Sequence, residues 1–123
     1  MQSSWRYHSP MTVERDASAS QFRKGVVELA ILGLLASRPR YGSQLVDDLA
    51  GYPALAITAG TVYPLLARLA AGDAVSTSWQ ESPVGPPRKY YALTDAGRER
   101  LASMAAAFTS ISQSMSTILE SSR

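Results

Sequence analysis

Apolar residues recur at helical spacing in four segments that follow a non-periodic start. Residues 1–20 contain five serines and no sustained apolar spacing, so we predict an arm outside the core. From Gln21 onward, apolar residues lie on almost every face of a helix that ends before Pro39. Such a helix must be buried on more than one side, and in a chain of 123 residues one side could belong to a second subunit.

Two shorter helices follow this first one. Residues 42–50 carry apolar positions at helical spacing and are followed by a glycine, a common C-terminal signal. Thr58 is a suitable N-cap for a third helix. Pro64 lies inside that helix at a cost of about 3 kcal/mol, so we expect the helix to begin late, near Thr61, or to kink. Its apolar stripe consists of Val62, Leu65, Leu66 and Leu69.

The spacing then changes from a period of 3.6 to a period of 2. Side chains alternate in residues 74–80 and again in 88–93, which predicts two short strands. The connector, residues 81–87, holds three prolines and one glycine and predicts a stiff hairpin tip. A two-stranded hairpin is not stable alone, so it must pack against the helices.

A last helix is predicted from its N-cap Thr94 to about Leu119. Its large apolar residues are spaced three and four apart, the a/d seam of a coiled coil. At roughly 37 Å the helix is longer than a three-helix core can cover, so we expect a second copy of the helix to cover it. The predicted dimer interface is Leu101, Met104, Phe108, Ile111, Met115 and Ile118.

Helix, helix, turn, helix, hairpin, helix is the element order of a winged helix-turn-helix protein. We therefore predict an α+β, mainly α fold with a two-stranded wing and a long C-terminal dimerisation helix. The expected parts are an arm (residues 1–20), a winged helix-turn-helix domain (21–93) and the dimerisation helix (94–123). In such modules the second helix of the motif enters the major groove of DNA, and the wing reaches along the backbone.

Composition and the absence of known motifs exclude several classes of function. The hydrophobic content of 46% and the net charge of +2 describe an ordinary globular chain with a mild basic bias. The chain has no cysteine and one histidine, so Cys/His zinc sites, disulfides and thiol catalysis are excluded. It has no P-loop, HExxH, GxSxG or GxGxxG motif, and we expect no enzyme, metal or cofactor. Without a membrane-spanning run or a signal-peptide core, we predict a soluble cytoplasmic protein.

Basic and small polar residues gather where a winged helix-turn-helix meets DNA. Small residues at the start of the third helix allow close approach, and hydroxyl groups there can bond phosphates or base edges. Cations at the start of the returning strand would neutralise phosphate. The predicted DNA contacts are Arg23, Lys24, Ser43, Thr58, Gly60, Thr61, Tyr63, Pro64, Arg68, Arg88 and Lys89.

Other charged and aromatic residues receive simpler interpretations. Arg40 flanks the second helix, and we expect it on the same basic surface. Asp47 and Asp48 are adjacent on a helix and point about 100° apart, so a solvated face is expected instead of a catalytic pair. Tyr90 and Tyr91 are expected to pack on the wing.

Three stretches resemble the PadR-like transcriptional regulators: FRKGVVELAILGLLASRPRYGSQLVDDL, ITAGTVYPLLARL and ESPVGPPRKYYALTDAGRERL, over roughly residues 21–101. The single tail helix is similar to the small subgroup of that family, in which this helix pairs with its dimer mate. The resemblance implies a homodimeric repressor that binds double-stranded DNA at an inverted-repeat operator. It also implies release when a small, often aromatic molecule binds. We expect that effector at the dimer interface, bounded by the first helix and by Met104, Phe108 and Ile111.

The chain departs from the family's pattern in three places. Ser43 stands where the family commonly has tyrosine, and Asp73 stands where a turn expects glycine, although Asp tolerates the left-handed conformation. The dimer helix has no tryptophan, and Phe108 is its only aromatic residue. The same pattern also fits an alternative hypothesis, a winged helix that binds a protein partner instead of DNA.

Overall fold

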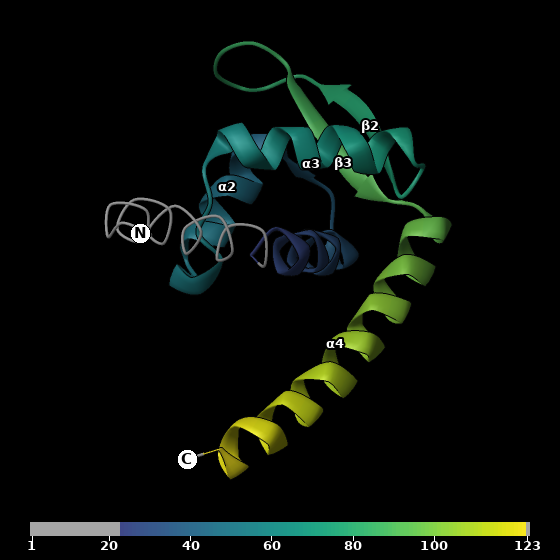
Figure 1. The fold of residues 1–123 in the computed structure, drawn as a ribbon. Helices are drawn as coiled ribbons and strands as arrows, with labels where there is room; N and C mark the ends of the chain where they lie inside the picture. Colours follow the sequence, from purple (N-terminus) through teal and green to yellow (C-terminus); the bar gives the residue numbers. More distant parts are fainter. Residues whose placement is uncertain (1–22, 123) are drawn as a thin grey trace, which may run out of the picture.

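The computed structural model describes residues 23–122, so the predicted N-terminal arm lies outside the described residues. The described chain forms a helical domain with a small sheet on one side and a long helix that projects away from it (Figure 1). The first helix occupies residues 23–37 of the described part. The other elements are β1 (Arg40–Tyr41), α2 (Gly42–Ala50), a short 3-10 helix (Pro53–Leu55), α3 (Ala59–Ala71), β2 (Val75–Gln80), β3 (Arg88–Leu93) and α4 (Asp95–Ser121).

The sheet has one strand more than the sequence predicts. The hairpin of β2 and β3 is confirmed, but β1 pairs with the other edge of β3, with Arg40 opposite Tyr91 and Tyr41 opposite Tyr90. The expected two-stranded wing is therefore the outer part of a three-stranded antiparallel sheet. A two-residue strand is too short for an alternation of side chains to reveal it.

Helix α3 begins earlier than the sequence predicts. The expectation of a start near Thr61 is wrong, because the Thr58 carbonyl accepts hydrogen bonds from the backbone N–H groups of Thr61 (3.0 Å) and Val62 (3.1 Å). The first turn is thus complete before Pro64. The proline removes only the bond to the carbonyl of Gly60, and Gly60 is exposed, so water can satisfy that carbonyl.

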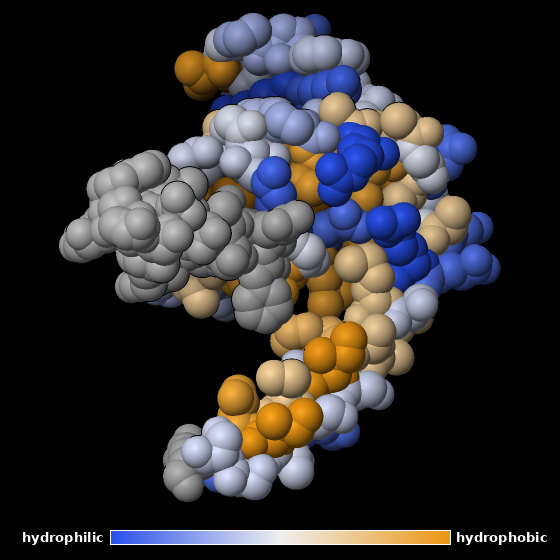
Figure 2. Space-filling view, viewed as in Figure 1, coloured by the Kyte–Doolittle hydropathy of each residue, from blue (hydrophilic) through white to orange (hydrophobic). Residues whose placement is uncertain are grey.

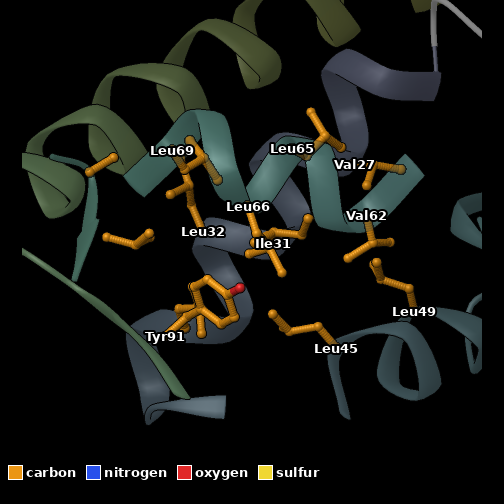
Figure 3. Packing of buried hydrophobic residues seen from close by; sticks show 13 residues of the cluster. Val27, Ile31, Leu32, Leu45, Leu49, Val62, Leu65, Leu66, Leu69 and Tyr91 are labelled. Carbon is orange, nitrogen blue, oxygen red and sulfur yellow. The ribbon is translucent and has the colours of Figure 1, made fainter. Parts of the chain in front are cut away.

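The core is one apolar cluster to which the first helix, α2, α3 and the base of the sheet all contribute (Figure 3). Val75 and Tyr91 are buried, whereas the rest of β2 is exposed, so only the base of the wing packs on the helices. Leu101 and Met104 of α4 pack against the same cluster. The buried residues are Val27, Ile31, Leu32, Leu35, Leu45, Leu49, Val62, Leu65, Leu66, Leu69, Ala74, Val75 and Tyr91.

Arg40 belongs to the interior and not to the basic surface on which the sequence places it. Its guanidinium donates to the Leu34 carbonyl (3.0 Å) and the Ser37 hydroxyl (2.9 Å), and it pairs with Asp48 at 2.7 Å. Arg40 is only 9% exposed, so this charge-assisted network closes the C-terminal end of the first helix. The solvated face expected for Asp48 is likewise corrected, because Asp48 holds that arginine.

Helix α4 is fixed to the domain at its N-terminal end. The Thr94 hydroxyl accepts from the backbone N–H of Gly97 at 3.0 Å and lies 2.6 Å from the Asp73 carbonyl oxygen, which confirms the predicted N-cap. Asp73 adopts a φ of 63°, the left-handed conformation expected for it. Gly97 is buried against the carbonyl of Ala74, so the turn after α3, the start of β2 and the start of α4 meet at one point.

We predict that Gly97→Ala destabilises the protein by about 1–3 kcal/mol. The added methyl group would clash with the Ala74 carbonyl oxygen, which cannot retreat because it already accepts the Thr94 backbone N–H at 3.1 Å. Gly72→Ala is the matched control: Gly72 has a φ of −92°, and its new methyl group would lie 3.6 Å from the nearest atom outside its neighbours. Thermal unfolding should show a clear drop in Tm for the first variant only; equal Tm values would contradict the close packing.

Candidate nucleic-acid interface

A cavity of about 410 Å³ lies between the start of α2, helix α3 and the wing. We call it the wing hollow. Its lining combines aromatic rings, hydroxyl groups and two cations, and no carboxylate takes part. A surface of this kind suits a polyanion that also offers flat or apolar faces. The lining residues are Tyr41, Gly42, Ser43, Tyr63, Trp79, Arg88, Lys89 and Tyr91.

Tyr63 reaches from α3 across the first residue of α2. Its ring lies so close to Gly42 that a Cβ atom built there would be 2.7 Å from Cζ and from the hydroxyl oxygen of Tyr63. The ring can pack here because Gly42 has no side chain. Tyr63 is still 43% exposed, so part of this residue remains accessible at the surface of the wing hollow.

Aromatic rings hold the two cations of the wing. The Arg88 guanidinium lies 4.4 Å from the centroid of the Tyr41 ring, and the Lys89 ammonium lies 5.8 Å from that of Tyr91. Tyr41 in turn packs edge-on against Tyr90 at 5.3 Å. Within the described residues neither cation pairs with a carboxylate, so both charges remain available to a polyanion.

Tyr91 forms the floor of the wing hollow and is part of the core. Burial, with a smaller contribution from Tyr63, raises the pKa of Tyr91 above the ordinary tyrosine value. The phenol therefore stays protonated at neutral pH. The expectation that Tyr90 and Tyr91 pack on the wing is corrected in its partners, because Tyr90 packs against Tyr41 of β1 and Tyr91 is buried in the core cluster.

A second, smaller cavity of about 120 Å³ lies on the other side of the α3 N-terminus. We call it the helix hollow. The backbone is accessible here because two of its six residues, Gly60 and Pro64, have little side chain to cover it. The cations come from two elements, Lys24 of the first helix and Arg68 of α3. The lining residues are Lys24, Gly60, Thr61, Pro64, Leu65 and Arg68.

The two hollows bring together nine of the eleven DNA contacts that the sequence predicts. Thr58 and Arg23 are exposed but line neither hollow. Arg68 is only partly free, because its guanidinium lies 3.1 Å from the buried carboxylate of Glu28. The predicted contact at Arg68 therefore coexists with an ion pair inside the domain.

Sequence reasoning missed the aromatic part of the wing hollow. Tyr41 and Trp79 line it, and neither is in the predicted set. Trp79 lies opposite Lys89 in the hairpin and is 69% exposed. An indole on the exposed part of a hairpin beside a cation is the signal that was present in the sequence. Tyr41 could not be found in the same way, because its position depends on the unforeseen strand β1.

The described residues contain no group of His, Cys, Asp and Glu side chains that could hold a metal ion. In the same part of the chain, no helix combines the length and apolar character needed to cross a membrane. The surface features that remain are the two basic hollows and the apolar side of α4.

Residues 31–103 match the family model of the transcriptional regulator PadR-like family, which is more than half of the chain. The chain belongs to this family. It is therefore related to DNA-binding transcriptional regulators and not to enzymes. No curated protein matches the chain significantly.

Solved structures of PadR regulators support this assignment. A PadR-like transcription factor from Bacteroides fragilis is 40% identical, with a TM-score of 0.68 over 80% of this chain and 95% of that one. A PadR-like regulator from Bacillus cereus is 31% identical, with a TM-score of 0.73 over 80% and 96%. A PadR family regulator from Eggerthella lenta is 30% identical, with a TM-score of 0.74 over 89% and 97%. The winged helix-turn-helix prediction is confirmed.

We predict that Gly42→Ala weakens DNA binding by about tenfold, or ~1.4 kcal/mol. The new methyl group would overlap with the Tyr63 ring, which now packs against Gly42. Because a side chain can change its rotamer more easily than the backbone can move, we expect Tyr63 to adopt another rotamer. Fluorescence anisotropy with a labelled duplex measures the affinity, and circular dichroism checks that the fold persists. Gly72→Ala, the same chemical change at the far end of α3, should bind like the parent protein. Unchanged affinity for Gly42→Ala would remove Tyr63 from the interface.

Proposed function

We propose that this PadR-like regulator is a homodimeric repressor that binds an inverted-repeat operator and leaves it when a small apolar molecule binds. The observation that carries the proposal is the pair of hollows on either side of the α3 N-terminus, both lined by cations and hydroxyl groups. A helix flanked in this way can enter the major groove while the hollows receive the sugar-phosphate backbones on either side.

Each part of the surface has a distinct role in this proposal. Gly60 and Thr61 approach base edges, since small side chains let the helix enter deeply. Ser43 and Tyr63 offer hydroxyl groups to phosphates. The two wing cations, which aromatic rings hold in place, neutralise the backbone. Because its target is DNA, we place the protein in the cytoplasm.

The dimer is proposed to form through α4. Beyond Met104, the four remaining large residues of the predicted seam are all exposed in the single chain, and Ile111 is 62% exposed. Figure 2 shows apolar side chains gathered along one side of this helix. A contiguous apolar stripe of this size marks an interaction surface. A second α4, related by a two-fold axis, supplies the same seam in return.

The effector is proposed to bind where α4 passes the first helix. A cavity of about 380 Å³ lies there, which we call the tail hollow. Its lining is almost wholly apolar and includes Met104, Phe108 and Ile111, so a small apolar or aromatic molecule fits its chemistry. Such a ligand acts by preferring one arrangement of α4 over another. The other lining residues are Gly25, Val26, Leu29, Ala107, Ser112 and Met115.

The salt dependence of binding tests the role of the wing. For a duplex selected from a random pool, the slope of log K against log salt concentration should become shallower by about 0.9 for each phosphate contact removed. The double variant Arg88→Ala/Lys89→Ala should therefore lose nearly 2 units of slope. Arg98→Ala removes the same kind of charge from the base of α4 and should leave the slope unchanged. An unaltered slope in the double variant would contradict phosphate contact by the wing.

A charge in the seam of α4 tests the dimer. Ile111→Glu should raise the dimer dissociation constant about 100-fold or more, because the carboxylate would be buried without a partner. Gln113→Glu is the matched control, since Gln113 is exposed and lies about 200° around the helix from Ile111. Sedimentation equilibrium measures both proteins. A parent protein that is monomeric at micromolar concentration, or an Ile111→Glu dimer of unchanged stability, would rule out this interface.

A further inference from the structure

Glu28 is a buried carboxylate that joins three helices. It lies on the first helix, and its side chain is only 9% exposed. One oxygen, Oε1, accepts from Arg68 of α3 at 3.1 Å. The other, Oε2, accepts from both Nη2 (2.5 Å) and Nε (3.1 Å) of Arg100 in α4. A single carboxylate thus ties the proposed recognition helix to the proposed dimerisation helix.

The bond to Arg100 is a directional restraint on α4. The other attachments described above are the Thr94 cap and the contact of Gly97 with Ala74 at its base, and the apolar packing of Leu101 and Met104 on the core just beyond Arg100. From Arg100 to the end of the helix, α4 extends by roughly 30 Å. A tilt of about 10° at its base would move the far end by roughly 5 Å.

We propose that Glu28 and Arg100 are positioning residues that set the angle between α4 and α3, and thereby the separation of the two α3 helices in the dimer. This inference rests on the proposed function. In a two-fold dimer joined through α4, any change in that angle is applied on both sides of the axis. Since the half-sites lie about 34 Å apart, a shift of a few ångströms puts one helix out of register with its groove.

The ion pair between Glu28 and Arg100 is better suited to fixing the angle of a helix than to merely holding two helices together. Apolar packing tolerates sliding, whereas a guanidinium directs two N–H groups at one carboxylate oxygen and fixes both distance and direction. The carboxylate also restrains Arg68, which lines the helix hollow. The Glu28 carboxylate therefore binds Arg68, a cation of the proposed DNA surface, and also holds α4 through Arg100.

The test uses the full chain and duplexes that carry two selected half-sites at stepwise spacings, together with a duplex that carries a single half-site. The parent protein should prefer one spacing sharply. Arg100→Gln should lose about tenfold in affinity at that spacing, and less than twofold at neighbouring spacings and on the single half-site. Arg100→Lys, which keeps a charge for Glu28, should retain part of the preference. Light scattering should still show a dimer.

Arg98→Gln is the matched control, because Arg98 lies on the same turn of α4 and is exposed without an ion pair among the described residues. It should keep the parent's spacing profile. If Arg100→Gln unfolds below the assay temperature, Glu28→Gln, which preserves the side-chain shape, replaces it and should broaden the spacing preference in the same way.

The outcomes separate the two proposals. An unchanged spacing profile in the folded variants, or an equal loss at every spacing and on the single half-site, would overturn the positioning role and leave the proposed function standing. A parent protein that binds no duplex specifically, or that is indifferent to spacing, would overturn the dimeric DNA binding itself.

Discussion

The contact between Gly97 and the Ala74 carbonyl is the constraint on which the rest of the arrangement depends. It brings the turn after α3, the first residue of the wing and the start of α4 to one point. Thr94 strengthens this junction with its backbone N–H and its hydroxyl group, both directed at the same turn. Because backbone meets backbone there, the junction cannot relax by a change of side-chain rotamer. The proposed recognition helix, the wing and the dimerisation helix are therefore held to one another as a unit.

The sequence predicted those elements that apolar spacing and flanking residues define within a short segment. The bounds of α2 and β3 match the predicted ranges, because apolar spacing and flanking residues define each of them within about ten residues. The strand β1 and the buried Arg40–Asp48 pair were not predictable in this way. Their meaning comes from a partner strand fifty residues away or from the end of a neighbouring helix. The early start of α3 also shows that one proline is a weak signal when the first turn is already satisfied.

The site was predictable in its residue types and not in its geometry. The N-terminal half of α3 and the wing cations were identified because a helix-turn-helix order fixes which residues point outward. The packing of Tyr63 against Gly42 was not predicted, since it joins α3 to α2 and no local pattern relates the two helices. Glu28 was hidden for the same reason: its partners lie 40 and 72 positions along the chain, and nothing in an apolar helix indicates which cations will reach its one acidic residue.

The tail hollow and the seam of α4 share Met104, Phe108, Ile111 and Met115, so the proposed dimer and effector site cannot be independent. A molecule that fills the hollow must either fit beside the partner helix or displace it, and in both cases it changes the preferred angle of α4. The rigid junction at Gly97 and the bond from Arg100 to Glu28 hold α4 to α3, so a change in the angle between the two α4 helices of the proposed dimer would move the two α3 helices relative to each other. In this proposal, coupling between effector and DNA needs no flexible pathway, only a ligand that favours one angle of a stiff helix.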